Sequence, residues 1–316
     1  MEVERKFIKI GERPDGSKVQ LPIIKIKGEI GGPKVFIGVT IHGSEVTGQV
    51  SVWKLLDYIK KHGIKGELTI IPVMNPEGFN YNVRGIPEST IDLNRIYPGD
   101  PNGSFAERIV AKIWEIAKQH ELIVDVHTAG KSIPFVILDP APQPLRSKIE
   151  EYAYSMGITV LDEFPPEKYE RRALAKSLPG VAIKENIPSF TVELPGYRGV
   201  DEVGAEAGYR ALKNLLIKTG MIDGEFEELD NLVPVIKEKG YRRETIQSNY
   251  GGLVELHKKL GEKVDENEVV AVIRNVFGEV IGEVKSPWNG YIISINASSR
   301  VATGGSVASI AIKMKK

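Results

Sequence analysis

The sequence of 316 residues predicts an α/β protein with a mixed, mostly parallel sheet and flanking helices, followed by a small all-β domain. Two observations support this prediction. Short apolar runs typical of buried strands alternate with amphipathic helical patterns over most of the chain, and such alternation favours a sheet with many parallel strands. After residue 240 the helical patterns stop, and short β segments separated by Gly, Pro, Asn and Ser replace them.

The predicted elements follow a strand and helix rhythm up to residue 218. Strand patterns lie at residues 7–10, 21–26, 35–41, 68–74, 122–126 and 189–192, and the turn signal Asp15-Gly16 separates the first two. Helix patterns lie at residues 45–61, 104–120, 145–156 and 203–218. Gly63 follows the end of the first helix, and Ser104 with Glu107 forms a capping-box signature at the start of the second.

The end of the chain is predicted to form a separate β domain. Residues 221–240 are rich in Glu, Asp and Lys and lack an amphipathic pattern, so we interpret them as a linker between domains at 1–220 and 241–316. Within 241–316 one half resembles the other. Apolar residues recur at identical spacing, as Val264, Val270, Ala271 and Ile273 and again as Val301, Val307, Ala308 and Ile310. This repeat predicts two interlocked β units and resembles the barrel sandwich of biotinyl and lipoyl carriers.

The composition excludes several classes of function. The 42 basic and 42 acidic residues cancel, so no bulk charge attracts nucleic acid or anionic lipid. The absence of cysteine excludes disulfides and thiolate nucleophiles, and a metal would need nitrogen and oxygen ligands. No apolar run approaches the ~20 residues of a membrane span, and the start MEVERKFIKI lacks the apolar stretch of a signal peptide. We expect a cytoplasmic protein that acts on a small molecule.

Four polar side chains lie at the ends of predicted strands. His42, Asn75 and His127 follow three of the strands, and Glu193 ends a fourth. Ligands of open α/β sheets bind at the edge formed by the carboxyl ends of the strands. We therefore expect these side chains to share one site.

Three residues of this group have the composition of a metal site. His42 and Glu45, in GVTIHGSEVTG, come where a strand passes into a helix, so one turn can direct both side chains to one point, and His127 can add a third ligand. Two His and one carboxylate are typical of hydrolytic zinc sites, because zinc keeps an open position for the water that it activates. A lone His-x-x-Glu is weak evidence, since it is often only a cap and a surface charge. The remaining histidines lie at predicted helix ends or on a β surface: His62, His120 and His257.

The motifs of the chain, taken in order, resemble one enzyme family. HGSE at 42–45, NPEG at 75–78, DLNR at 92–95, His127 and VELPG around Glu193 are similar to motifs of the succinylglutamate desuccinylase and aspartoacylase group of zinc carboxypeptidase-like hydrolases. The resemblance covers nearly the whole chain, including the C-terminal β domain. It implies a zinc carboxypeptidase-like fold and one Zn²⁺ per chain held by His42, Glu45 and His127. The implied reaction is hydrolysis of the amide bond of a small N-acyl amino acid.

The resemblance also implies roles in catalysis. Glu193 would take a proton from the zinc-bound water and return it to the leaving amine. Arg84 corresponds to the arginine that stabilises the oxyanion of the tetrahedral intermediate. The alternative for Glu193 is an exposed carboxylate at the end of a strand.

Further residues are implied in substrate binding and in support of the metal. Asn94 and Arg95 resemble the pair that binds a substrate carboxylate, although a loop arginine paired with Asp92 or Asp100 is the alternative. Asp92 would orient a zinc-binding histidine through its second ring nitrogen, and Asp125 competes for that role.

Two other functions compete with the deacylase interpretation. A zinc carboxypeptidase acting on short peptides would use the same metal and the same arginine. A carrier or binding protein built around the C-terminal domain is the second alternative, but residues 274–278, at the hairpin that joins the half-repeats, contain no lysine for a carrier group. We expect the C-terminal domain to pack over the entrance of the zinc site and to restrict access to small acyl amino acids.

The sequence does not define the substrate further. We find no equivalent of the additional arginine and the C-terminal tyrosine that aspartoacylases use for acetylaspartate, so acetylaspartate is not the expected substrate. The acyl group, the amine and a homo-oligomeric state are left open.

Overall fold

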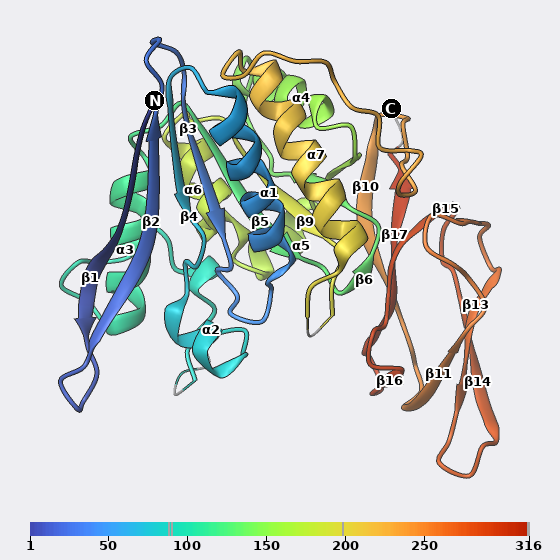
Figure 1. Ribbon diagram of the computed structural model, residues 1–316. Helices are drawn as coiled ribbons and strands as arrows, with labels where there is room; N and C mark the ends of the chain where they lie inside the picture. Colours follow the sequence, from blue (N-terminus) through green and yellow to red (C-terminus); the bar gives the residue numbers. More distant parts are fainter. Residues whose placement is uncertain (88, 90, 198, 315–316) are drawn as a thin grey trace.

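The computed structural model describes residues 1–87, 89, 91–197 and 199–314. The last two residues of the predicted C-terminal domain, 315 and 316, lie outside this set. Most strands join one large mixed sheet of 13 strands, and a second sheet has four. Figure 1 shows the large sheet extending from the N-terminal hairpin to the strands at the C-terminus.

The first part of the chain contributes β1 to β9 to the large sheet. β1 and β2 form an antiparallel hairpin, β4, β3, β5 and β9 run parallel, and β7 is antiparallel to β9 but parallel to β8. The prediction of a mixed sheet with many parallel pairs is therefore confirmed. The bounds are β1 Glu2–Glu12, β2 Lys18–Lys27, β3 Lys34–Val39, β4 Glu67–Ile71, β5 Leu122–Thr128, β6 Lys131–Ser132, β7 Phe135–Leu138, β8 Thr159–Asp162 and β9 Ser189–Leu194.

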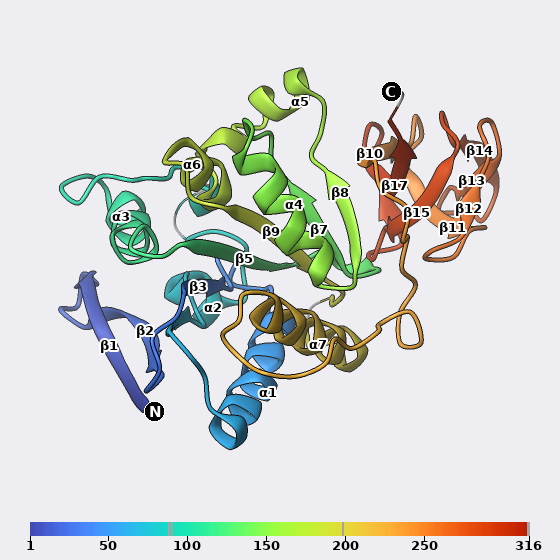
Figure 2. The ribbon, with the colours of Figure 1, turned by 90° about the horizontal axis from the view of Figure 1, so that it is seen from above.

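Helices cover both faces of this sheet. Residues 35, 37 and 39 of β3 pack with α1, α4 and α7, whereas Phe36 points to the other face and packs with α3 and α6. Figure 2 shows α1 and α7 on one side and α3 and α6 on the other. The helices are α1 Thr47–His62, α2 Pro76–Tyr81, α3 Phe105–Ala117, α4 Leu145–Ser155, α5 Pro166–Arg171, α6 Leu178–Lys184 and α7 Glu202–Lys218, with 3₁₀ turns η1 Leu93–Arg95 and η2 Leu174–Lys176. None of the helices in the described part of the chain is long and apolar enough to cross a membrane.

The predicted helix ends agree with the capping interactions. The Ser104 hydroxyl accepts a hydrogen bond from the Glu107 amide, and the Glu107 carboxylate accepts one from the Ser104 amide, so the capping box is confirmed. Gly63 has a positive φ of 80° after α1. α1 begins at Thr47, two residues later than predicted, because residues 42–46 form the turn that carries His42 and Glu45.

The C-terminal segment extends the large sheet and adds the second one. β10 pairs in parallel with β8, and β17, β15 and β12 follow it. The recurring apolar residues predicted from the half-repeat pack together in one cluster, with seven of them buried and Val301 partly buried. The strands are β10 Tyr241–Gln247, β11 Gly252–Leu256, β12 Lys263–Val264, β13 Val269–Arg274, β14 Val280–Lys285, β15 Gly290–Ile295, β16 Arg300–Val301 and β17 Ser306–Lys313.

A small apolar cluster joins the two parts of the chain. Leu161 on β8 packs with residues 133, 135 and 137 and with Tyr241 and Ile293 of the C-terminal strands. Because Leu161 is only 1% exposed, its burial contributes to the contact between the two parts.

We expect Leu161→Ala to lower the free energy of unfolding by about 2–5 kcal/mol, because it leaves a cavity in this cluster. Denaturant unfolding measures the effect. Val276→Ala is the control, since Val276 is 87% exposed and should change stability by less than about 0.5 kcal/mol. Equal stability of the two variants would contradict the role of this cluster.

Candidate active site

The turn after β3 is held in one conformation by local contacts. Thr40 has a positive φ of 58°, which is unfavourable for a β-branched residue. Its hydroxyl donates to the Glu45 carbonyl at 2.9 Å and accepts from the Gln49 side chain at 3.1 Å. Gly43 lies so close to α2 that an added Cβ would be 1.8 Å from the carbonyl carbon of Gly78. The sequence HGSE therefore fixes the backbone between His42 and Glu45.

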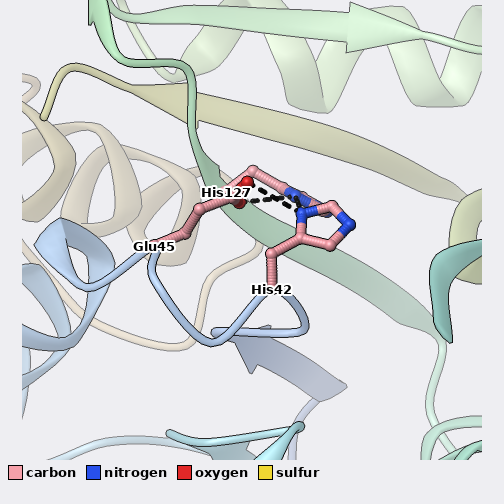
Figure 3. A group of neighbouring side chains, drawn as sticks. All are labelled: His42, Glu45 and His127. Atoms are coloured by element: carbon pink, nitrogen blue, oxygen red, sulfur yellow. Dashed lines mark hydrogen bonds and ion pairs between the residues drawn. The ribbon is translucent and has the colours of Figure 1, made fainter. Parts of the chain in front are cut away.

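The three predicted metal ligands converge at this turn (Figure 3). His42 and Glu45 come from the turn, and His127 is the penultimate residue of β5 and not, as predicted, the residue after the strand. The Nδ1 atoms of the two histidines are 3.2 Å apart, and each lies 2.8–3.0 Å from an oxygen of Glu45. Ligand atoms of a tetrahedral zinc ion are about 3.3 Å apart at the usual bond lengths. The donor atoms thus have the chemistry to hold a metal ion, and their spacing is close to that of zinc ligands.

Carboxylates hold the outer nitrogens of both histidines. His42 Nε2 lies 3.1 Å from Asp92 Oδ1, and His127 Nε2 lies 2.9 Å from Asp125 Oδ2. Each imidazole can donate its Nε2 proton outward and present a free Nδ1 electron pair inward. The two aspartates, which the sequence presented as competitors, each contact a different histidine.

The charges around Glu45 keep this group ionised. Burial opposes ionisation, but His42 and His127 outweigh it and hold the pKa of Glu45 well below its usual range. The backbone amide of Thr128 also donates to Glu45 Oε2 at 3.1 Å. Glu45 is therefore a carboxylate, the form that binds a metal.

Arg84 and Asn75 belong to the same corner but have different surroundings. The Arg84 guanidinium is half-exposed and contacts Asp92 at 2.8 Å and Glu45 at 3.4 Å. Asn75 is buried, and its side chain caps α2 and bonds to the carbonyls of Arg84 and Gly85. Asn75 thus positions the loop that carries Arg84 and does not line the cavity.

A cavity of about 270 Å³ opens beside the three ligands and is lined by Glu193. Glu193 is the penultimate residue of β9 and lies opposite His127 in the paired strands. Burial raises the pKa of Glu193, with Glu45 acting in the same direction, whereas His127 and Arg243 oppose the shift. A carboxylate that titrates closer to neutral pH is suited to accept and return a proton.

The predicted substrate-binding pair divides into two roles. Asn94 is buried, and its side-chain amide donates to Asp125 at 3.0 Å and accepts from the Leu178 amide at 2.9 Å. Arg95 lines the cavity and donates to the Asn94 carbonyl at 2.7 Å. Asp92 pairs with Arg84, and within the described part of the chain Arg95 forms no ion pair with Asp92 or Asp100.

Four charged residues of the cavity were missed in the sequence: Asp139, Glu163, Arg172 and Arg243. Asp139 and Glu163 directly follow β7 and β8, so their places after strands were a signal that could have found them. No local pattern distinguishes Arg172, after α5, or Arg243 in β10, because tertiary contacts alone bring them to the cavity. The two arginines add positive charge to the cavity, and the sequence had not predicted them as site residues.

The sequence is similar to that of one family of known proteins. The model of the family described as succinylglutamate desuccinylase/aspartoacylase catalytic domain matches residues 31–216. The chain belongs to this family. The matched range contains His42, Glu45, His127 and Glu193, so the family resemblance predicted from the motifs is confirmed.

Individual relatives of the family extend the similarity to the C-terminal part. The chain is 25% identical over 323 aligned positions to the N-alpha-acetyl-L-2,4-diaminobutyric acid deacetylase of Halomonas elongata, covering 98% of this chain and 91% of the relative. The crystal structure of a succinylglutamate desuccinylase/aspartoacylase from Rhodobacter sphaeroides has a TM-score of 0.85 at 22% identity, covering 99% of this chain and 96% of that chain.

A more distant solved structure shares the fold over about two thirds of this chain. A metallo-carboxypeptidase from Burkholderia cenocepacia has a TM-score of 0.54 at 15% identity, covering 68% of this chain and 65% of that chain. The mixed α/β fold is therefore similar to that of metallocarboxypeptidases.

We expect His42→Ala and His127→Ala to lose bound zinc, since each removes one of three ligands. Elemental analysis of the purified proteins measures the metal content. His257→Ala is the matched control, because the His257 side chain is 43% exposed and its ring lies 3.8 Å from the Glu255 carboxylate. Wild-type zinc content in the first two variants would place the metal elsewhere.

Proposed function

We propose that the protein is a zinc-dependent hydrolase that cleaves the amide bond of a small N-acyl amino acid. The observation that carries the proposal is the convergence of the His42, Glu45 and His127 donor atoms beside a cavity that also contains Glu193. The relative from Halomonas elongata, which is named as a deacetylase of an acylated amino acid, supports the same reaction. We further propose one zinc ion per chain.

The residues of the site divide the reaction between them. A zinc ion bound by His42, Glu45 and His127 would supply an acidified water and positive charge for the amide carbonyl. Glu193 accepts a proton as attack begins and donates it to the leaving nitrogen. Arg84, held against Glu45 and Asp92, places a guanidinium where negative charge develops on the carbonyl oxygen.

The carboxylate of the amino acid has a binding group in the cavity. Arg95 presents a guanidinium that forms no ion pair with any carboxylate of the described residues and is fixed by its bond to the Asn94 carbonyl. A planar guanidinium can bind a carboxylate through two parallel hydrogen bonds. We propose that Arg95 binds the substrate carboxylate and that Asn94 supports it while holding Asp125 against His127.

The C-terminal strands contribute to the size of the site. Ile293, Ser294 and Ser309 line the cavity from β15 and β17. A cavity of about 270 Å³ with such a wall suits a small acyl amino acid and excludes a folded or long peptide. This wall favours small substrates over long peptides. Carboxypeptidase activity on short peptides, which would use the same metal and the same arginine, is the alternative function.

A carrier function finds no support at the C-terminal hairpin. Residues 275–279 between β13 and β14 contain no lysine that could accept a prosthetic group. The proposal therefore assigns residues 241–316 to shaping the substrate cavity, with 221–240 as the connection.

We expect Glu193→Gln to retain zinc and fold but to lower kcat by about a hundredfold or more, because an amide cannot accept the proton. Steady-state hydrolysis of N-acetyl amino acids, together with zinc analysis, measures this. The control is Glu185→Gln, an exposed carboxylate just before β9, which should leave kcat unchanged. Loss of zinc in the Glu193 variant would instead make Glu193 a ligand.

We expect Arg95→Lys to raise KM for N-acyl amino acids by about tenfold with a smaller effect on kcat, since a point charge replaces a two-pronged donor. Kinetics on an N-acyl amino acid and on its carboxamide provide the comparison. Arg171→Lys, at the exposed end of α5, is the control. A similar rise in KM for the carboxamide would show that Arg95 does not bind the carboxylate.

A further inference from the structure

The cavity extends from the metal ligands along one face of the sheet. Phe135, Ile137 and Asp139 alternate along and just beyond β7, and all three line the cavity. Alternate residues of a strand share a face, and Phe135 lies opposite Glu193 in the paired strands. The cavity therefore has a part near the metal ligands and an inner part that reaches Asp139, whose side chain is buried.

Two of the charges in the inner part neutralise each other. Arg243 donates two hydrogen bonds to Glu163, through Nε at 2.6 Å and through an Nη atom at 2.7 Å. Both side chains are largely buried, with 20% and 5% exposed. This paired geometry supplies Glu163 with a cation inside the protein, so Glu163 is not an unpaired carboxylate.

Asp139 has no such partner. Its carboxylate accepts a hydrogen bond from the Tyr169 hydroxyl, and it forms no ion pair with any lysine, arginine or histidine that the structure describes. Arg146 donates to the backbone carbonyl of Asp139 at 3.3 Å, but it forms its ion pairs with Glu150 and Asp162. A buried carboxylate without a cation is energetically costly, and such a group in a cavity marks a place for a ligand cation.

Cations without a carboxylate partner line the same cavity. Arg172 packs 4.8 Å from the ring of Phe164, and neither Arg172 nor Arg95 forms an ion pair within the described chain. The cavity thus offers two guanidinium groups to an anion and one buried carboxylate to a cation. A ligand that carries both charges satisfies both.

We propose that Asp139 binds an ammonium group of the substrate and that the substrate is an amino acid with two amino groups, one of them acylated. The inference rests on the proposed hydrolase function for its reaction, but the ammonium site itself rests on the partners of Asp139. An ammonium site at Asp139 disfavours N-acyl derivatives of aspartate or glutamate, because their second carboxylate would be repelled by the Asp139 carboxylate.

The protonation of Asp139 gives this site a pH dependence. Burial raises the pKa of Asp139 to about 7, with Glu163 and Asp125 adding to the shift and Tyr169 and Arg243 opposing it. An ammonium ligand needs the ionised carboxylate. Affinity for the ammonium ligand should therefore be full above about pH 7 and fall as the pH drops below it, whereas a neutral ligand should show no such change.

The test measures binding separately from turnover. In the Glu193→Gln variant, calorimetry measures the affinity for the Nα-acetyl derivatives of 2,4-diaminobutyrate, ornithine and lysine. Each is compared with the N-acetyl straight-chain amino acid in which a methyl group replaces the side-chain ammonium group. We expect at least one amine to bind about tenfold or more tightly than its alkyl partner. Adding Asp139→Asn should abolish the preference without weakening the alkyl ligand more than about threefold, and Asp57→Asn, on the exposed face of α1, should preserve it.

The outcomes separate this proposal from the proposed function. The ammonium site is overturned if every alkyl ligand binds more tightly than its amine partner, or if no pair differs in affinity. It is also overturned if acetylaspartate binds more tightly than the amines. If Asp139→Asn does not fold, the test uses the protein with Asp139 intact and measures how the preference for the amine over the alkyl ligand changes with pH. A preference that is constant from pH 6 to 8 overturns the site. Selective amine binding without hydrolysis of any acyl amino acid by the wild type would leave the site standing and refute the hydrolase.

Discussion

The contacts of Asp92 and Asp125 with the outer nitrogens of the two histidines are the constraint on which the site depends. Each contact fixes which nitrogen of an imidazole points inward. Asp125 is itself held by the Asn94 amide, and Asp92 accepts from the Asn94 backbone. One short turn of the DLNR motif therefore controls the orientation of both ring systems.

The same turn connects the metal ligands to the substrate cavity. Asp92 binds Arg84, and the backbone carbonyl of Asn94 holds Arg95. A displacement of this turn would move the histidines and both arginines together. This coupling explains in physical terms why Asp92, Asn94 and Arg95, three residues of one turn, make different contacts in the site.

The sequence contained enough information to predict the ligands but not the far wall of the cavity. His42 and His127 could be found because buried strands of the first half are strongly apolar and end at polar residues. β7 and β8 have only four residues each, too few for a reliable strand pattern, and the residues that follow them were missed. Arg243 reaches the cavity only because β10 pairs with β8, a long-range contact that no local pattern encodes.

The pairing of β10 with β8 also attaches the C-terminal segment to the large sheet. The sequence predicts a domain at residues 241–316 that packs over the site. In the structure its strands continue the large sheet and supply part of the cavity wall. Arg243 and Glu163 join the two parts inside that wall. The wall of the cavity and the attachment of the C-terminal strands are thus linked through one buried ion pair.

The most direct test of the central claim is the hydrolysis of N-acyl amino acids by the full-length protein before and after removal of its metal. We predict that chelation abolishes the activity and that added Zn²⁺ restores it in proportion, up to one ion per chain. Full activity in protein shown by elemental analysis to be free of metal would contradict the account.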